Sequence, residues 1–216
     1  MQATNPFFTR ALAAAVLMML ALLASTANAQ TPNDVIRSAS DELAAALSER
    51  KEELAADPAA LYAAVDAIIQ PRFDRRYAAQ LVLGRNWRNA SEEQRAAFID
   101  AFYASLLQKY ADGALEFNED QIQILPFRGD ETKPRVIVKS LVTLNDGTEV
   151  PVDYGLVRRD SGWKVFDVII EGISYVRNFR AELNSEIRSS NLDAVIERLQ
   201  RDTGSAGSSD DEATSE

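Results

Sequence analysis

Three carboxylates near the two expected hairpin strands are the groups best placed to do chemistry: Asp153, Asp167 and Glu171. Glycoside hydrolysis needs two such groups facing each other across a cleft. The competing interpretation is structural. Asp167 could pair with Arg135 or Lys139 on a neighbouring strand, and Glu171 lies close to a helix start, where negative charge is favourable. We favour the structural interpretation and expect no catalytic residue.

Two absences from the 216-residue chain narrow the chemistry further. It contains no histidine and no cysteine, which excludes the usual zinc sites and both Ser-His-Asp and Cys-His catalysis. There is also no G-x-S-x-G motif, no phosphate-cradling glycine loop and no dinucleotide fingerprint. An enzyme would therefore have to work with carboxylates, tyrosine, lysine or Ser-Lys pairs, and we expect neither a metal nor a cofactor.

The first 29 residues have the layout of a secretory signal peptide. A single arginine precedes an unbroken apolar run over residues 11–24, and Ala27-Asn28-Ala29 supplies an A-x-A cleavage signal. The run is short for a membrane span, although a membrane anchor is the alternative. We expect cleavage after Ala29, a folded domain over residues 30–202 and an acidic disordered tail over residues 203–216.

The charge distribution bears on the kind of partner. The formal net charge is -10 for the full chain, and it becomes -11 without residues 1–29, which carry one arginine and no acid. Nucleic acid is therefore not an expected partner. One segment is locally basic, because residues 72–88 hold a single acid, Asp74, against five arginines: Arg72, Arg75, Arg76, Arg85 and Arg88. These arginines form either a solvated helix face or a contact for an acidic partner or a lipid headgroup.

Apolar periodicity and capping signals predict helices on both sides of a strand-rich middle segment. A first helix over 32–57 has Asn33 or Asp34 as its cap, and Asp57 caps a second helix that ends near residue 70. A short helix over 73–83 ends before Gly84. Residues 91–113, opened by a capping box at Ser91, form a long helix rich in aromatic residues. Two more helices start after Ser174 and Asn191.

Four strands are expected between the long helix and the last two helices, over residues 121–127, 135–144, 148–159 and 163–170. The turn Asn145-Asp146-Gly147 predicts a hairpin between the second and third strands. Strict alternation places Val165 and Ile169 on the same face of the last strand. Helices, an antiparallel sheet and further helices in this order indicate the α+β class.

Two segments resemble a known family. They are "YAAQLVLGRNWRNASEEQRAAFIDAFYASLLQKYA", residues 77–111, and "GWKVFDVIIEGISYVRNFR", residues 162–180. Both are similar to the MlaC or toluene-tolerance family of periplasmic phospholipid-binding proteins. The matching features are an LG before an aromatic-basic pair, an S-x-x-Q-R box, an F-x-x-x-F helix, and the Gly-Trp strand with its E-G-I-S turn. Each motif is modest, but their order and spacing together are specific over roughly residues 33–200.

The resemblance implies a soluble periplasmic shuttle without covalent chemistry. Proteins of this family carry glycerophospholipid between an outer-membrane lipoprotein complex and an inner-membrane ABC transporter with an MCE-type component. The implied fold packs the N-terminal helices on a small antiparallel sheet and adds C-terminal helices, so that the elements enclose an apolar cavity. We expect a monomer. A hydrolase or isomerase on a cone-like α+β sheet and an adaptor without a ligand are the alternative interpretations.

The facing of the expected elements predicts which residues form the wall of this cavity, although each could instead be ordinary core. They come from the long helix, the sheet and the later helix: Phe102, Tyr103, Leu106, Leu107, Val138, Val152, Tyr154, Val165, Ile169, Tyr175 and Phe179. The headgroup or a partner is expected to meet Arg72, Arg75, Arg76 and Arg88.

Overall fold

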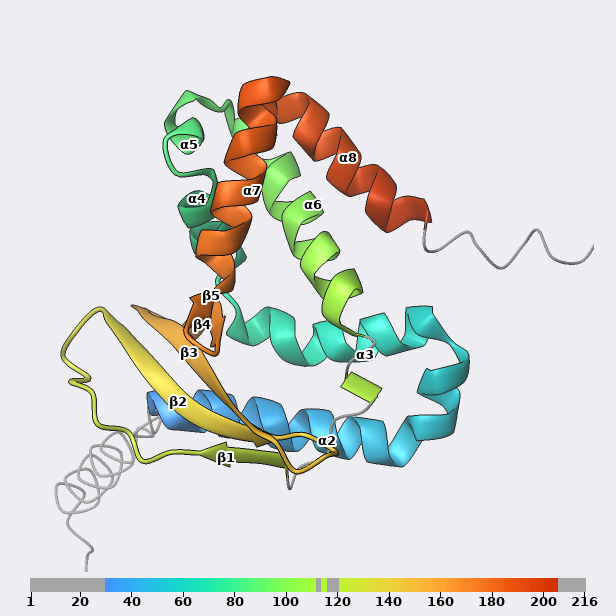
Figure 1. Ribbon diagram of the computed structural model, residues 1–216, viewed down its shortest axis with the longest axis vertical. Coiled ribbons are helices and arrows are strands. Elements are labelled where there is room, and N and C mark those ends of the chain that lie inside the picture. Colours follow the sequence, from blue (N-terminus) through green and yellow to red (C-terminus); the bar gives the residue numbers. More distant parts are fainter. Residues whose placement is uncertain (1–29, 112–113, 116–120, 206–216) are drawn as a thin grey trace, which may run out of the picture.

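The computed structural model describes residues 30–111, 114–115 and 121–205 (Figure 1). The predicted signal peptide and residues 206–216 of the predicted tail lie outside these ranges. None of the helices within them combines the length and the apolar content needed to cross a bilayer.

Two helices open the described chain: α2 (Pro32–Ala56) and α3 (Pro58–Ile69). The N-cap of α2 is Thr31, not Asn33 or Asp34 as predicted. Thr31 and Asp34 form a capping box in which each side chain accepts a hydrogen bond from the other residue's backbone N–H. Asp57 caps α3 as predicted, and its carboxylate accepts hydrogen bonds from the backbone of the first turn.

A 3-10 turn, η1 (Gln70–Arg72), leads to three further helices: α4 (Arg75–Leu83), α5 (Asn86–Asn89) and α6 (Glu92–Ala111). Phe73 is not helical, contrary to the prediction. It forms an isolated bridge with Val165 of the sheet, and the next residue, Asp74, caps α4 through Tyr77 N. The capping box at the start of α6 is confirmed by reciprocal bonds between Ser91 and Gln94.

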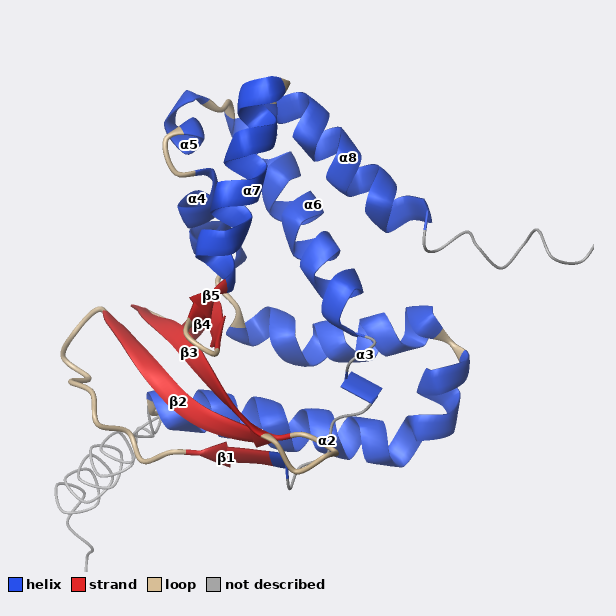
Figure 2. Cartoon of the chain, in the orientation of Figure 1, coloured by secondary structure: helices blue, strands red, loops and turns tan. Residues whose placement is uncertain are grey.

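The sheet is an antiparallel meander in which each strand pairs with the next along the chain (Figure 2). Its strands are β1 (Ile122–Ile124), β2 (Arg135–Thr143), β3 (Glu149–Arg159), β4 (Gly162–Ile170) and β5 (Ile173–Ser174). The predicted β2–β3 hairpin is confirmed. β5 was not predicted, because two residues are too few to produce an alternating pattern.

A β-bulge interrupts the pairing of β3 with β4. Gly155 is paired with Asp167, whereas the next residue, Leu156, is paired with Val165, so Phe166 has no partner of its own. Beyond an inserted residue the alternation of faces is reversed. Val165, Val168 and Ile170 therefore share one face with Leu156 and Tyr154 of β3. Ile169 lies on the opposite face, contrary to the strict alternation that we expected.

Asp167, on the other side of this bulge, ties β4 to the helix that follows the sheet. This helix is α7 (Tyr175–Ser189), and its predicted cap, Ser174, is confirmed by a bond from Arg177 N. The buried Asp167 carboxylate accepts hydrogen bonds from Ser174 Oγ at 2.6 Å and from Val176 N at 3.0 Å. The predicted pairing of Asp167 with Arg135 or Lys139 is wrong, because β3 separates β2 from β4.

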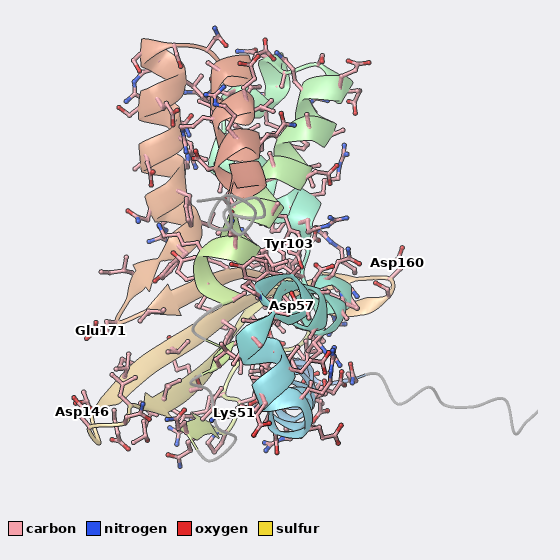
Figure 3. The ribbon with its side chains drawn as sticks, turned by 90° about the vertical axis from the view of Figure 1, so that its right-hand side faces the viewer. Lys51, Asp57, Tyr103, Asp146, Asp160 and Glu171 are labelled. Atoms are coloured by element: carbon pink, nitrogen blue, oxygen red, sulfur yellow. The ribbon has the colours of Figure 1, made fainter. Side chains whose placement is uncertain are left out.

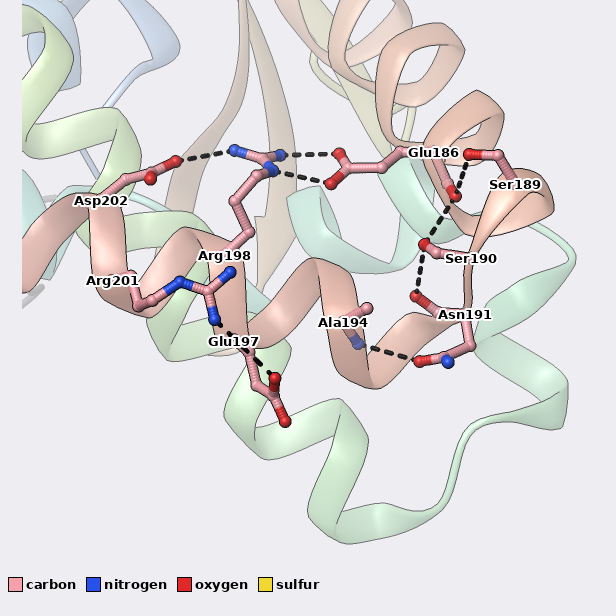
Figure 4. Close-up of polar contacts among 9 residues, drawn as sticks. All are labelled: Glu186, Ser189, Ser190, Asn191, Ala194, Glu197, Arg198, Arg201 and Asp202. Carbon is pink, nitrogen blue, oxygen red and sulfur yellow. Dashed lines mark hydrogen bonds and ion pairs between the residues drawn. The ribbon is translucent and has the colours of Figure 1, made fainter.

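The last helix, α8 (Leu192–Ser205), packs on α6 and α7. Asn191 caps it as predicted, through a bond from Ala194 N. The helix continues to Ser205, into the segment that we predicted to be a tail from Thr203 onward. Arg198 joins α8 to α7 through two bonds to Glu186, and it also bonds to Asp202 on its own helix (Figure 4).

The elements form two parts around three hydrophobic clusters (Figure 1). Helices α4 to α8 enclose the largest cluster, which is centred on buried residues such as Phe98, Phe102 and Leu183. The N-terminal half of α2 packs Val35 and Ile36 on the sheet. The far half of α2 forms a third cluster with α3 and the end of α6. Helix α3 crosses between the two parts, and the three clusters meet around one hollow.

We predict that Arg198→Ala lowers the free energy of unfolding by about 1 kcal/mol, because it removes the bidentate ion pair with Glu186 that joins α7 to α8 at a partly exposed site. The matched control is Arg201→Ala, which removes a more exposed pair with Glu197 at 3.9 Å within α8. We expect this control to cost less than about 0.3 kcal/mol in urea denaturation. An equal loss of unfolding free energy in the two variants would contradict the conclusion that the Arg198–Glu186 pair stabilises the contact between α7 and α8.

A second prediction concerns the Asp167 anchor. Asp167→Ala leaves the Val176 N–H and the Ser174 hydroxyl without their buried acceptor, so we expect a loss of about 2 kcal/mol in the free energy of unfolding. Asp153→Ala removes a carboxylate that has no hydrogen bond or ion pair with the described part of the chain, and it should change stability by less than about 0.5 kcal/mol. Thermal and urea unfolding of both variants measure the difference, and a stable Asp167→Ala protein would refute the anchor.

Candidate ligand-binding cavity

An apolar cavity of about 430 Å³ lies where the three clusters meet. Its walls come from α2, α3, α6, the sheet and the start of α7. Of the residues predicted to line a cavity, eight do so: Phe102, Tyr103, Leu106, Leu107, Tyr154, Val165, Tyr175 and Phe179. A mostly apolar pocket of this size is typical of small-molecule binding sites.

The other three predicted wall residues do not line the cavity. Val138 is fully buried in the cluster between β2 and α2, so the helix covers it. Ile169 is turned away by the bulge in β4. Val152 has the correct face but is paired with Ile170, which occupies the wall at that end of the sheet.

Several wall residues were missed by the sequence analysis. Val35, Ile36 and Leu43 contribute one side from α2, a helix from which no wall residue was predicted. Val168 and Ile170 of β4 were placed on the opposite face, since the sequence pattern gives no sign of the bulge. The one available signal was that both faces of this strand are apolar, which means that either face could have pointed into the cavity.

Aromatic packing fixes the helical side of the wall. The rings of Phe98 and Phe102 are stacked with their centroids 5.6 Å apart, and Phe179 meets Phe102 edge-on at 5.5 Å. Such pairs contribute stability beyond the area they bury. They join α6 to α7 and hold the rings of Phe102 and Phe179 against the hollow.

The cavity opens beside the end of α6. Tyr110 is 42% exposed, the highest exposure among its described lining residues. Its ring meets that of Tyr175 edge-on, with centroids 5.4 Å apart. Burial, the neighbouring Tyr175 and the charge of Glu182 raise the pKa of Tyr110 to about 12. The opening is thus bordered by the side chains of Tyr110 and Tyr175, whose rings are apolar and whose hydroxyls are polar.

Tyr103 forms a polar point in the wall, near the junction of helices and sheet (Figure 3). Its hydroxyl donates a hydrogen bond to Asp66 Oδ1 at 2.7 Å, and the guanidinium of Arg75 lies 5.1 Å from its ring centroid. Burial and the Asp66 bond raise the pKa of the Tyr103 hydroxyl, so this group stays protonated. The Tyr103 hydroxyl is therefore already paired with Asp66, and the ring of Tyr103 is the part that faces the cavity.

The four predicted headgroup or partner arginines are not gathered at one place. Arg72 lines the cavity, but its guanidinium donates to Ile68 O at 2.7 Å and pairs with Glu42. Arg75 and Arg76 instead line a separate polar hollow of about 360 Å³. Arg88 is an exposed residue of α5 and lines neither hollow.

The three carboxylates considered for catalysis do not face one another across the cavity. Asp167 lines it, but both of its oxygens accept hydrogen bonds. Glu171 is exposed in the β4–β5 turn (Figure 3). Asp153 lies on β3 and is not among the lining residues of the cavity. Within the described ranges, no three acidic side chains come together as a group that could hold a metal ion.

Comparison with known proteins gives consistent matches over most of the chain. A toluene tolerance protein, ttg2D, from Pseudomonas putida is 33% identical over 186 residues, which cover 83% of this chain and 86% of that protein. The intermembrane phospholipid transport system binding protein MlaC of Haemophilus influenzae is 24% identical, over 83% of this chain and 86% of its own length.

A solved structure supports the fold. It is the phospholipid-binding protein from Ralstonia solanacearum in complex with a phospholipid, and it superposes with a TM-score of 0.74 at 24% identity. The match covers 82% of this chain and 98% of that one. In addition, the family model described as "MlaC protein" matches residues 37–201. The chain therefore belongs to the MlaC family, as the resemblance of its motifs indicated.

Proposed function

We propose that this protein binds phospholipid in its apolar cavity and carries it between membranes. The observation that carries the proposal is the cavity itself, an almost wholly apolar space of about 430 Å³ whose most exposed described wall residue is the amphipathic Tyr110. The family and the phospholipid-related names of two relatives support it. Membership of a family of lipid-binding transport proteins also speaks against an enzyme.

The energetics of lipid transfer call for such a container. Each methylene removed from water gains about 0.8 kcal/mol, so two long acyl chains represent on the order of 20 kcal/mol. A lipid leaving one membrane unaccompanied must overcome this cost. A wall of leucine, valine and aromatic side chains offsets it, while the hydrophilic outer surface keeps the carrier in water.

The proposed setting is the periplasm. It rests on the signal-peptide layout of residues 1–29, with cleavage after Ala29. As the family resemblance implies, a monomer would exchange glycerophospholipid with an outer-membrane lipoprotein complex and an inner-membrane ABC transporter that has an MCE-type component. Lipid transport of this kind would maintain the asymmetry of the outer membrane.

The direct test is to identify what the purified protein carries. The full chain is expressed with its signal sequence, and the exported mature protein is purified without detergent. The purified protein is extracted with organic solvent, and the extract is analysed by mass spectrometry. We expect diacyl phospholipid in near-stoichiometric amount. An empty protein that also takes up no labelled phospholipid from vesicles would refute the proposal.

A substitution that fills the cavity should reduce lipid binding. Val168→Trp places a large side chain in the wall, so we expect lipid occupancy to fall at least about fivefold while the fold is retained. The matched control is Ile169→Trp, one residue along the same strand but on the other face. Occupancy is measured by phosphate content per protein. Equal loss in both variants, or loss only in the control, would show that the cavity is not the binding site.

A further inference from the structure

Lys109 occupies an unusual position at the opening of the cavity. It lies in the last turn of α6 and is exposed. Its Nζ is 5.7 Å from the ring centroid of Tyr110 and 5.5 Å from that of Phe179. Because both rings also line the cavity, the ammonium group is held directly against the wall where the cavity meets solvent.

Among the described residues, no carboxylate forms an ion pair with the ammonium group of Lys109. Within the described ranges this group also has no hydrogen bond. Arg72, the cation that lines the cavity, differs because Glu42 and Ile68 O already occupy its guanidinium. An ammonium group has three N–H donors, so contact with two ring faces leaves donors free for an anion.

A lysine near a helix C-terminus also has an ordinary explanation, since it interacts favourably with the helix dipole. That explanation accounts for the residue type but not for the placement of the side chain over two cavity-lining rings. The surroundings favour an amphipathic ligand. Tyr110 and Tyr175, whose rings meet edge-on, mark the boundary between apolar interior and solvent.

We propose that Lys109 binds the phosphate of a lipid whose acyl chains fill the cavity, which makes it a specificity residue for phosphate-bearing lipids. This inference rests on the proposed function and adds to it the group that recognises the head of the ligand. Lysine acts as a point charge and lacks the planar fork with which arginine reads a particular shape. The contact therefore selects the phosphate shared by phospholipids and does not distinguish the alcohol attached to it.

The test compares two soluble lipids with the same chains, dioctanoyl phosphatidylglycerol and dioctanoyl glycerol. Both are titrated against a fluorescent fatty acid bound to the purified, delipidated protein. Lys109→Gln should weaken binding of the phosphatidylglycerol about three- to tenfold, the usual range for one charged contact at a partly exposed site. Binding of dioctanoyl glycerol, which has no phosphate, should stay within about twofold.

Two further variants separate the phosphate contact from general effects. Lys51→Gln removes the same charge from an exposed site on α2, away from the cavity wall (Figure 3), and should leave both lipids unaffected. Lys109→Arg keeps the charge and should retain the preference for phosphate. The inference is overturned if Lys109→Gln weakens both lipids equally or leaves phosphatidylglycerol binding unchanged. If the wild-type protein binds neither lipid, the proposed function fails as well.

Discussion

The bulge at Phe166 determines what each face of β4 meets, and the cavity depends on it. With Phe166 unpaired, Val165, Val168 and Ile170 share the face that looks into the hollow. The same reversal directs Asp167 to the start of α7, where its carboxylate holds Ser174 and Val176. A regular strand would put Asp167 beside Val165 and would turn Val168 away. One inserted residue thus supplies both an apolar wall and the anchor of the helix that closes it.

The hollow persists because the elements around it are each fixed by other contacts. Each of the three hydrophobic clusters packs a different set of elements, so closing the hollow would require wall residues to leave the cluster in which they are packed. Polar bonds also set the spacing between helices and sheet. Asp74 N donates to Val165 O at 2.8 Å, and Arg159 Nε donates to Asp74 Oδ2 at 2.6 Å. An unfilled apolar space costs stability, so a ligand that fills it stabilises the folded state.

Much of the fold could be predicted because local signals and tertiary packing agree. The caps at Asp57, Ser91, Ser174 and Asn191 mark four helix starts, and Asn145-Asp146-Gly147 marks the hairpin. The part of the wall that comes from α6 and α7 was also predictable from its aromatic spacing, whereas the part from α2 was missed. The sheet wall was predicted only in part, at Tyr154 and Val165, since a bulge leaves no periodic trace and Val138 differs from a wall residue only by the helix lying over it. The choice between cavity and core depends on how distant elements pack, which periodicity does not report.

The central claim is that acyl chains lie inside this cavity, and it can be tested by locating them. The protein is loaded with a phospholipid carrying bromine atoms midway along its acyl chains, and anomalous scattering from crystals gives the bromine positions. We predict bromine peaks between α6 and β4, in contact with Phe102, Leu106 and Val168. Bromine on the outer surface, or in the polar hollow lined by Arg75 and Arg76, would contradict the claim.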